Sequence, residues 1–168
     1  PLYKQKTLCV VGGGDSAAGA AVYMADIAEK VYMIYRGDKL RAEDFWIKAI
    51  AKNQKIELIF NTNVVEIKGE NKIEEIILDK EYGGNRSLRL NGLFIEIGFN
   101  PNSILAQGLG VDLDAEGYVK IDKEGMTSKE GIWAAGDITD GSNKFKQIVT
   151  SAAEGAIAAN SIQKYLKK

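Results

Sequence analysis

Residues 7–17, TLCVVGGGDSA, decide the fold of this 168-residue chain. A short apolar run over 7–11 leads directly into three glycines, and such a run is typical of a strand buried in a parallel sheet. From Asp15 to about Glu29 the apolar residues are mostly small, which favours a helix that packs closely on that sheet. The stretch therefore predicts a strand, a tight turn and a helix.

The pattern continues outward from this stretch. A strand at 31–35, a helix at about 42–52 and a strand at 56–60 complete a β-α-β-α-β order, which is the doubly wound pattern. Three short strands then follow, separated by turns at 69–71 and 83–85, before a strand at 93–97. These three strands, expected at 64–67, 73–78 and 87–90, predict an antiparallel β-meander.

The residues from Gly98 to Asn102 interrupt the pattern, and we expect a domain boundary there. The remainder predicts a strand near 118–121, an apolar strand at 131–135 and a closing helix from about Gln147 to Leu166. The expected fold class is α/β, with a Rossmann-like three-layer domain over residues 1–100 and a second segment over 101–168.

Charge and composition exclude several functions. Lys and Arg number 22 against 23 Asp and Glu, so no nucleic acid or acidic membrane surface is expected as a partner. No apolar run approaches the roughly 20 residues of a membrane span, and residues 1–4 lack the apolar core of a secretory signal. The single cysteine fits a cytoplasmic protein. Without histidine, a His-based triad is impossible, so a bound cofactor must carry any chemistry.

The glycines after the first strand fit G-x-G-x-x-A. Gly12 permits the tight turn, Gly14 lets the backbone approach a pyrophosphate, and Ala17 permits close helix–strand packing. The helix N-terminus offers free N–H groups to phosphates, and Ser16 adds a hydroxyl donor. The motif predicts a dinucleotide site; the alternative is a tight turn without a ligand.

A basic turn, 35–41 (YRGDKLR), follows the second strand, where dinucleotide folds recognise the adenosine ribose. Arg36 and Arg41 can pair with a 2′-phosphate, and Lys39 adds positive charge, which predicts NADPH. Two alternatives stay open. Asp38 can serve as the acid that binds the 2′-hydroxyl of NAD, or the turn is simply a solvated charged loop.

A second cofactor signal lies in 127–137 (TSKEGIWAAGD), where an apolar stretch ends in Gly136-Asp137. A carboxylate at the end of such a strand can accept hydrogen bonds from a sugar-alcohol chain. Gln147 then opens a helix rich in small residues, whose N-terminus can stabilise negative charge on a reduced flavin. The alternative is that Asp137 only caps a turn.

Together these segments resemble, in order and over essentially the whole chain, the low-molecular-weight thioredoxin reductases and their close flavoprotein relatives. Residues 12–17 resemble the family's NADPH pyrophosphate loop, and 35–41 resemble its H-R-R-x-x-x-R phosphate clamp, with tyrosine and glycine at the first and third positions. Residues 92–98 with Pro101-Asn102 resemble its return strand. Residues 127–137 resemble its T-x-x-x-G-h-[FWY]-A-A-G-D flavin motif (h apolar), and 146–148 its R-Q-A flavin turn.

The resemblance implies NADPH and FAD as cofactors, with no catalytic side chain in this chain itself. The cofactor-binding residues expected from the motifs and the resemblance are Gly12, Gly14, Asp15, Ser16, Ala17, Tyr35, Arg36, Arg41, Ile97, Gly98 and Tyr118 for NADPH, and Gly136, Asp137, Lys146, Gln147, Ile148 and Val149 for FAD.

The resemblance further implies a homodimer that passes electrons to a redox disulfide and then to a thioredoxin-like or glutaredoxin-like protein. Residues 101–168 would be the C-terminal part of a discontinuous FAD-binding domain. Because the family's redox pair lies on a helix at the start of the NADPH domain, the resemblance implies a Cys-x-x-Cys within about ten residues before residue 1. Cys9 cannot replace it, because it lies in a buried strand as a packing residue. Two alternatives remain: a ferredoxin-NADP reductase-like flavoprotein without a redox disulfide, and a non-catalytic nucleotide-binding module.

Overall fold

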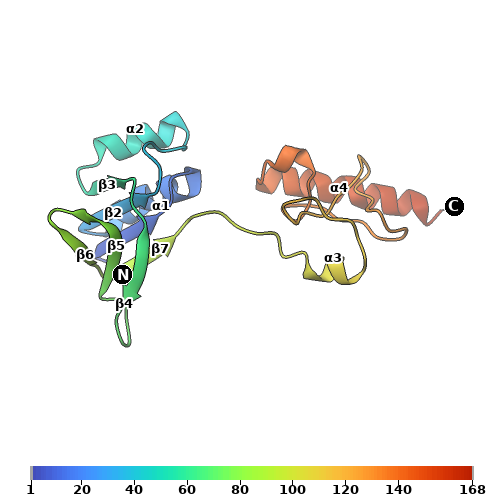
Figure 1. Ribbon diagram of the computed structural model, residues 1–168. Helices are drawn as coiled ribbons and strands as arrows, with labels where there is room; N and C mark the ends of the chain where they lie inside the picture. Colours follow the sequence, from blue (N-terminus) through green and yellow to red (C-terminus); the bar gives the residue numbers. More distant parts are fainter. Residues whose placement is uncertain (1, 168) are drawn as a thin grey trace. The chain divides into compact units, whose positions relative to one another are not determined.

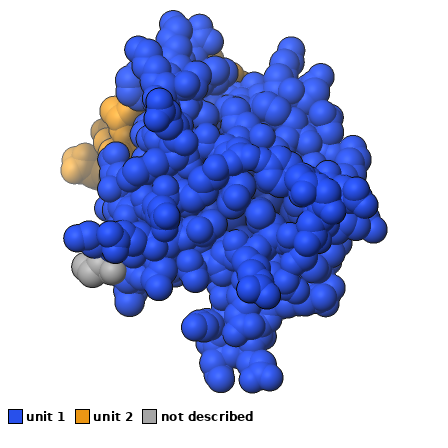
Figure 2. All heavy atoms as spheres, turned by 90° about the vertical axis from the view of Figure 1, so that its left-hand side faces the viewer, with its two compact units in different colours: residues 1–98 blue, residues 99–168 orange. Residues whose placement is uncertain are grey.

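The structure is a computed structural model that describes residues 2–167, and Figure 1 shows the order of its elements. The chain forms two compact units, the first ending at Gly98 and the second beginning at Phe99. Figure 2 distinguishes the two units by colour. The change of unit falls within the segment in which the sequence pattern breaks.

The first unit is built on a four-stranded parallel sheet. Its strands are β1 (Thr7–Val11), β2 (Lys30–Tyr35), β3 (Ile56–Phe60) and β7 (Gly92–Ile95), in the order β3-β2-β1-β7. Two helices connect the first three strands, namely α1 (Asp15–Ile27) and α2 (Asp44–Lys52). The predicted β-α-β-α-β order is confirmed as a parallel sheet, because every pairing in it is parallel.

The helices cover one face of the sheet. Leu8 and Val10 of β1, with Val31 and Met33 of β2, point to this face and are fully buried. The facing side of α1 consists of four buried alanines: Ala17, Ala18, Ala21 and Ala25. Because alanine adds one methyl group, the helix backbone can lie close to the strands, as the small residues predicted.

The antiparallel meander covers the opposite face. It consists of β4 (Val64–Lys68), β5 (Glu75–Tyr82) and β6 (Asn85–Arg89), in the order β4-β5-β6. Cys9 and Ile34 of the parallel sheet pack against Ile76 and Leu78 of β5 in a second buried cluster. The first unit therefore has three layers, as expected. In Figure 2 the turn between β4 and β5 projects below the body of the unit.

The second unit contains α3 (Ile104–Gly108), the short turn η1 (Ser142–Lys144) and the long helix α4 (Ile148–Tyr165). The closing helix is confirmed, whereas α3 was not expected. The strands predicted near 118–121 and at 131–135 were wrong. Only isolated bridges occur in this part of the chain, joining Leu113 to Val119, Val119 to Thr139 and Met126 to Trp133.

Aspartate side chains take backbone donors in and beside the first of these two segments. Asp114 accepts hydrogen bonds from the N–H groups of Glu116 and Tyr118 at 2.9 Å, and Asp122 accepts from Glu124 and Met126 at 2.8 and 2.9 Å. These carboxylates take donors that a strand ladder would use, and they fold the chain into local turns.

No helix within residues 2–167 is long and apolar enough to cross a membrane.

The buried thiol of Cys9 gives the first prediction. Its side chain is fully buried, and burial raises the pKa of the Cys9 thiol to about 12. Because the thiolate is the reactive form, iodoacetamide should modify Cys9 at least about a hundredfold more slowly in the folded protein than in urea. Peptide mass spectrometry over a time course measures this ratio. Equal rates in the two conditions would contradict the buried position.

Candidate functional site

The turn after β1 lies against the end of β2, the end of β7 and the start of α1. Gly12 has φ +146° and donates its N–H to the carbonyl of Ile34 at 3.0 Å. A Cβ atom on Gly12 would lie 2.2 Å from the carbonyl oxygen of Glu96 and 2.8 Å from the Cβ of Ala17. Only glycine can therefore occupy this position, because both the backbone angle and the contacts exclude a side chain.

The next part of the turn is open. Gly14 is the N-cap of α1, and a Cβ built on it would meet no atom within 4 Å. Ser16 is exposed in the first turn of the helix, whose N–H groups have no acceptor within the helix. A free helix N-terminus beside an uncovered glycine is an arrangement that can receive a phosphate group.

The basic turn after β2 is tied to the glycine turn by two hydrogen bonds. Arg41 donates its backbone N–H to the carbonyl of Gly13 at 2.7 Å. Asp15 accepts the backbone N–H of Glu43 at 2.7 Å, immediately before α2 begins. Because the strands are parallel, both turns lie at the carboxyl edge of the sheet, where ligands of such folds bind.

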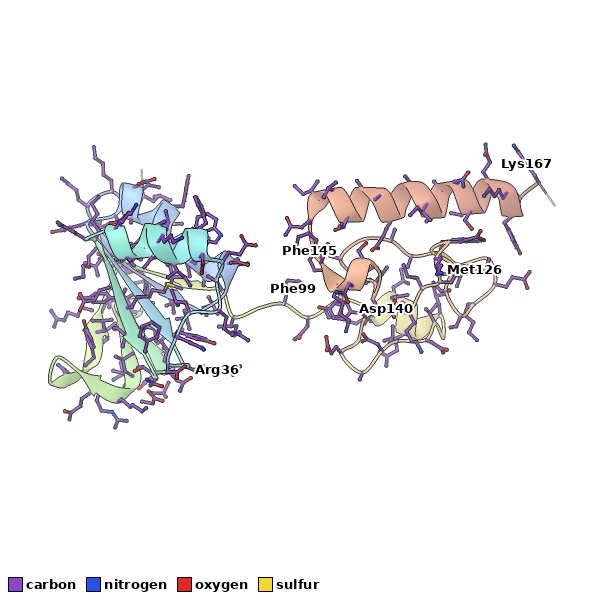
Figure 3. All side chains as sticks on the ribbon, turned by 90° about the horizontal axis from the view of Figure 1, so that it is seen from above. Arg36, Phe99, Met126, Asp140, Phe145 and Lys167 are labelled. Atoms are coloured by element: carbon purple, nitrogen blue, oxygen red, sulfur yellow. The ribbon has the colours of Figure 1, made fainter. Side chains whose placement is uncertain are left out.

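The cations of the basic turn are accessible. Arg36 and Arg41 are both exposed, and Figure 3 shows Arg36 at the margin of the first unit, just after β2 ends. The guanidinium of Arg41 lies 5.8 Å from the ring centre of Tyr35. No salt bridge involves either arginine among the described residues, so both charges are available to a ligand.

Ile97 and Gly98 follow β7, which ends at Ile95, two residues earlier than expected. Ile97 is 72% exposed, and Gly98 has φ +112°. The N–H of Glu96 still bonds the carbonyl of Val11 at 2.8 Å, so the chain leaves the sheet beside the glycine turn. Ile97 is thus an exposed apolar side chain near the same edge.

In the second unit, a carboxylate of α4 holds the Gly136-Asp137 segment. Glu154 accepts the N–H of Gly136 at 2.8 Å and the hydroxyl of Thr139 at 2.7 Å. Burial alone would raise the pKa of Glu154. Hydrogen bonds from Ser142, Thr139 and Gly136, with the charge of Lys146, outweigh burial and hold that pKa below its ordinary value of 4.5.

Asp137 itself remains exposed. One of its oxygens accepts the hydroxyl of Ser151 at 2.8 Å, and the structure shows no partner for the other oxygen in the described residues. Gly136 has φ +86°, which turns the chain sharply just before the carboxylate. The carboxylate is therefore oriented by α4 while keeping one acceptor free.

Lys146 is held beside a tyrosine ring. Its ammonium donates to the carbonyl of Thr139 at 2.6 Å and lies 4.3 Å from the ring centre of Tyr118. Lys144 lies 4.8 Å from the same ring centre and pairs with Asp114 at 2.7 Å. Tyr118 is only 7% exposed, so within this unit it serves as a platform for the two lysines.

A left-handed turn leads into α4. Ser142, Asn143 and Lys144 have φ between +49° and +56°, a region that costs about 1–2 kcal/mol per residue outside glycine. After it, Ile148 and Val149 open the helix with 92% and 71% of their surfaces exposed. Figure 3 labels Phe145, which joins the left-handed turn to this helix.

The structure groups the predicted residues into two sets. The first, in the first unit, joins the glycine turn to the basic turn. The second, in the second unit, gathers Gly136, Asp137 and residues 146–149 around the start of α4. Tyr118, which was expected to contact NADPH, also lies in this unit, beside Lys146. Sequence reasoning missed Glu154, whose only signal was a carboxylate among the small residues of the last helix.

Comparison with known proteins gives consistent matches. The model of the pyridine nucleotide-disulphide oxidoreductase family matches residues 2–155. The thioredoxin reductase of Eremothecium gossypii is 39% identical over 100% of this chain and 53% of its own length. The thioredoxin reductase of Bacillus subtilis is 40% identical over 99% of this chain and 52% of its own length.

Solved structures agree with the sequence matches. The thioredoxin reductase of Lactococcus lactis gives a TM-score of 0.86 at 30% identity, covering 99% of this chain and 55% of that one. The thioredoxin reductase of T. acidophilum gives 0.87 at 32% identity, with the same coverage. The chain thus spans about half the length of the relatives it matches.

The Glu154 network predicts a pH-dependent stability. Folding lowers the pKa of Glu154 below its ordinary value of 4.5. The ionised carboxylate therefore contributes its full stabilisation of the folded state above pH 4.5. This stabilisation is lost as the pH falls through the pKa that Glu154 has in the folded protein. Glu154→Gln should therefore destabilise the second unit by about 1–2 kcal/mol at neutral pH, and by less in acid. Hydrogen exchange of peptides covering 136–141 measures the effect.

The matched control for this prediction is Glu124→Gln, because Glu124 is exposed and its side chain has no partner in the described residues. If the amides of residues 136–141 are equally protected from hydrogen exchange in the wild type and in Glu154→Gln at neutral pH, Glu154 does not stabilise this segment.

Proposed function

Because the chain belongs to the pyridine nucleotide-disulphide oxidoreductase family, we propose that it is the NADPH-binding domain and the C-terminal flavin-contacting segment of a thioredoxin reductase. Residues 1–100 form the NADPH-binding domain, and residues 101–168 form one part of a discontinuous FAD-binding domain. The observation that carries this proposal is 39–40% identity to thioredoxin reductases across the whole chain, with both cofactor motifs in order.

The first unit binds NADPH along the carboxyl edge of its sheet. The uncovered Gly14 and the free N–H groups of α1 receive the pyrophosphate, with the exposed hydroxyl of Ser16 as a further donor. Arg36 and Arg41 pair with the 2′-phosphate. Asp15 contributes its backbone, because its carboxylate is bound to Glu43. Ile97 and Gly98 complete the site beside the turn.

The second unit contributes to an FAD site. Asp137 keeps one free carboxylate oxygen, which suits a ribityl hydroxyl, and the exposed side chains of Ile148 and Val149 suit the apolar face of a flavin ring. Bound FAD would supply the hydride acceptor and pass electrons to a disulfide. The residues of this chain bind the flavin and orient it, and Lys146 holds a positive charge at the start of α4.

The redox disulfide and the protein acceptor lie outside this chain. The buried Cys9, whose pKa is raised to about 12, cannot exchange with a disulfide. A Cys-x-x-Cys in the rest of the protein would pass electrons to a thioredoxin-like or glutaredoxin-like protein; the names of the relatives support the first of these. The family resemblance supports a homodimer as part of the proposal, and the single cysteine is in keeping with a cytoplasmic location.

Turnover of the intact protein tests this function. With NADPH, the purified flavoprotein should reduce a thioredoxin disulfide, and alkylation of the NADPH-reduced form should abolish that activity because the exposed thiols are blocked. Activity that survives alkylation, or reduction of a ferredoxin in place of thioredoxin, would contradict the proposal. The second result would favour the ferredoxin-NADP reductase-like alternative.

The flavin assignment gives a separate prediction. Asp137→Ala should lower FAD affinity by about tenfold, because a charge-assisted hydrogen bond contributes roughly 1.5–3 kcal/mol. Flavin released on dialysis of the intact protein, measured by fluorescence, reports the loss. Asp112→Ala is the control, because Asp112 is an exposed acid of the same unit. Undiminished FAD retention in the Asp137 variant would remove Asp137 from the site.

A further inference from the structure

Two glycines face the ring of Tyr35 from different parts of the chain. A Cβ atom on Gly13 would lie 2.5 Å from the Cδ2 atom of that ring, and one on Gly37 would lie 2.6 Å from its Cε1 atom. Real Cβ atoms do not approach that closely, so the ring occupies the space where a side chain at either position would begin.

The backbone around the ring cannot easily move away. The carbonyl of Gly37 accepts the N–H of Asn61 at 2.9 Å, and the carbonyl of Tyr35 accepts the N–H of Thr62 at 3.2 Å. On the other side, Gly13 is bonded through its carbonyl to Arg41. Hydrogen bonds therefore hold the backbone of Gly37 and Tyr35 to the residues after β3, and the backbone of Gly13 to the basic turn.

The same ring lies beneath a cation of the basic turn. The guanidinium of Arg41 is 5.8 Å from the ring centre, within the range of a cation–π contact, while the backbone N–H of Arg41 is bonded to Gly13 at 2.7 Å. Tyr35 thus restricts where the Arg41 side chain can lie, without neutralising its charge.

We propose that Tyr35 is a specificity-determining residue, which orients Arg41 toward the 2′-phosphate of NADPH and excludes a further basic side chain at position 37. This inference rests on the proposed function. Gly37 has an ordinary backbone angle, so it is not glycine for conformational reasons. Its lack of a side chain follows from the tyrosine ring. Discrimination between NADPH and NADH therefore depends on Arg36, on Arg41 and on the ring beneath Arg41.

The pair 35 and 37 should also behave as a unit. Gly37→Arg alone places a side chain against the ring and should not improve selectivity. Tyr35→Ala together with Gly37→Arg removes the ring that obstructs position 37, and it supplies another cation near the phosphate. The effects of the two substitutions should therefore be strongly non-additive, as expected for residues in contact.

The experiment measures kcat/KM of the intact flavoprotein with NADPH and with NADH. Arg41→Ala should lose about tenfold to a hundredfold with NADPH alone. Tyr35→Leu should lose about twofold to fivefold, also with NADPH alone, because its ring no longer restricts Arg41 and a cation–π contact at an exposed site contributes about 0.5–1 kcal/mol. Tyr35→Phe keeps the ring, so the ratio of kcat/KM with NADPH to kcat/KM with NADH should stay as in the wild type. Tyr23→Leu, at an exposed tyrosine of α1, is the control for this type of substitution.

A binding measurement separates recognition from turnover. Calorimetry measures the affinity for adenosine 2′,5′-bisphosphate and for AMP. Tyr35→Leu should lower the affinity for the bisphosphate and leave the affinity for AMP unchanged. Equal losses for both ligands, or an unchanged ratio in Tyr35→Leu, would overturn the role of Tyr35. Selectivity that rises in Gly37→Arg alone would do the same. A wild-type protein that uses neither nucleotide would instead reject the proposed function, and this inference with it.

Discussion

The close approach of the Gly12 backbone to the carbonyl of Glu96 is the contact on which the rest of the first unit depends. A Cβ at this position would lie 2.2 Å from that oxygen. The missing side chain lets β1 turn directly into α1 beside the end of β7, and Ala17 then packs against the turn. The switch in strand order between β2 and β7, on either side of β1, creates the edge where a dinucleotide can bind.

Local contacts extend this constraint to the neighbouring turn. The hydrogen bonds from Arg41 to Gly13 and from Glu43 to Asp15 make the glycine and basic turns one structure. The second unit uses a comparable device, because Glu154 binds the backbone of Gly136 and so fixes the carboxylate that follows. In both units, hydrogen bonds within the protein orient exposed polar groups.

Much of the first unit could be predicted because its signals are local. The apolar run, the glycines and the alanines of α1 each indicate a structure without reference to distant residues. The strand expected near 118–121 failed because the carboxylates of Asp114 and Asp140 bind the backbone N–H groups of Tyr118 and Ile121, and hydropathy does not show this competition. The ring of Tyr35 lies against Gly13, far away in sequence, so the coupling of positions 35 and 37 needed the structure.

A crystal structure of the intact protein with NADP⁺ tests the central claim most directly. We expect the pyrophosphate on the backbone of residues 14–16 and the 2′-phosphate between Arg36 and Arg41, with the guanidinium of Arg41 over the ring of Tyr35. A 2′-phosphate in solvent, or a pyrophosphate away from the glycine turn, would contradict the assignment of this edge as the nucleotide site.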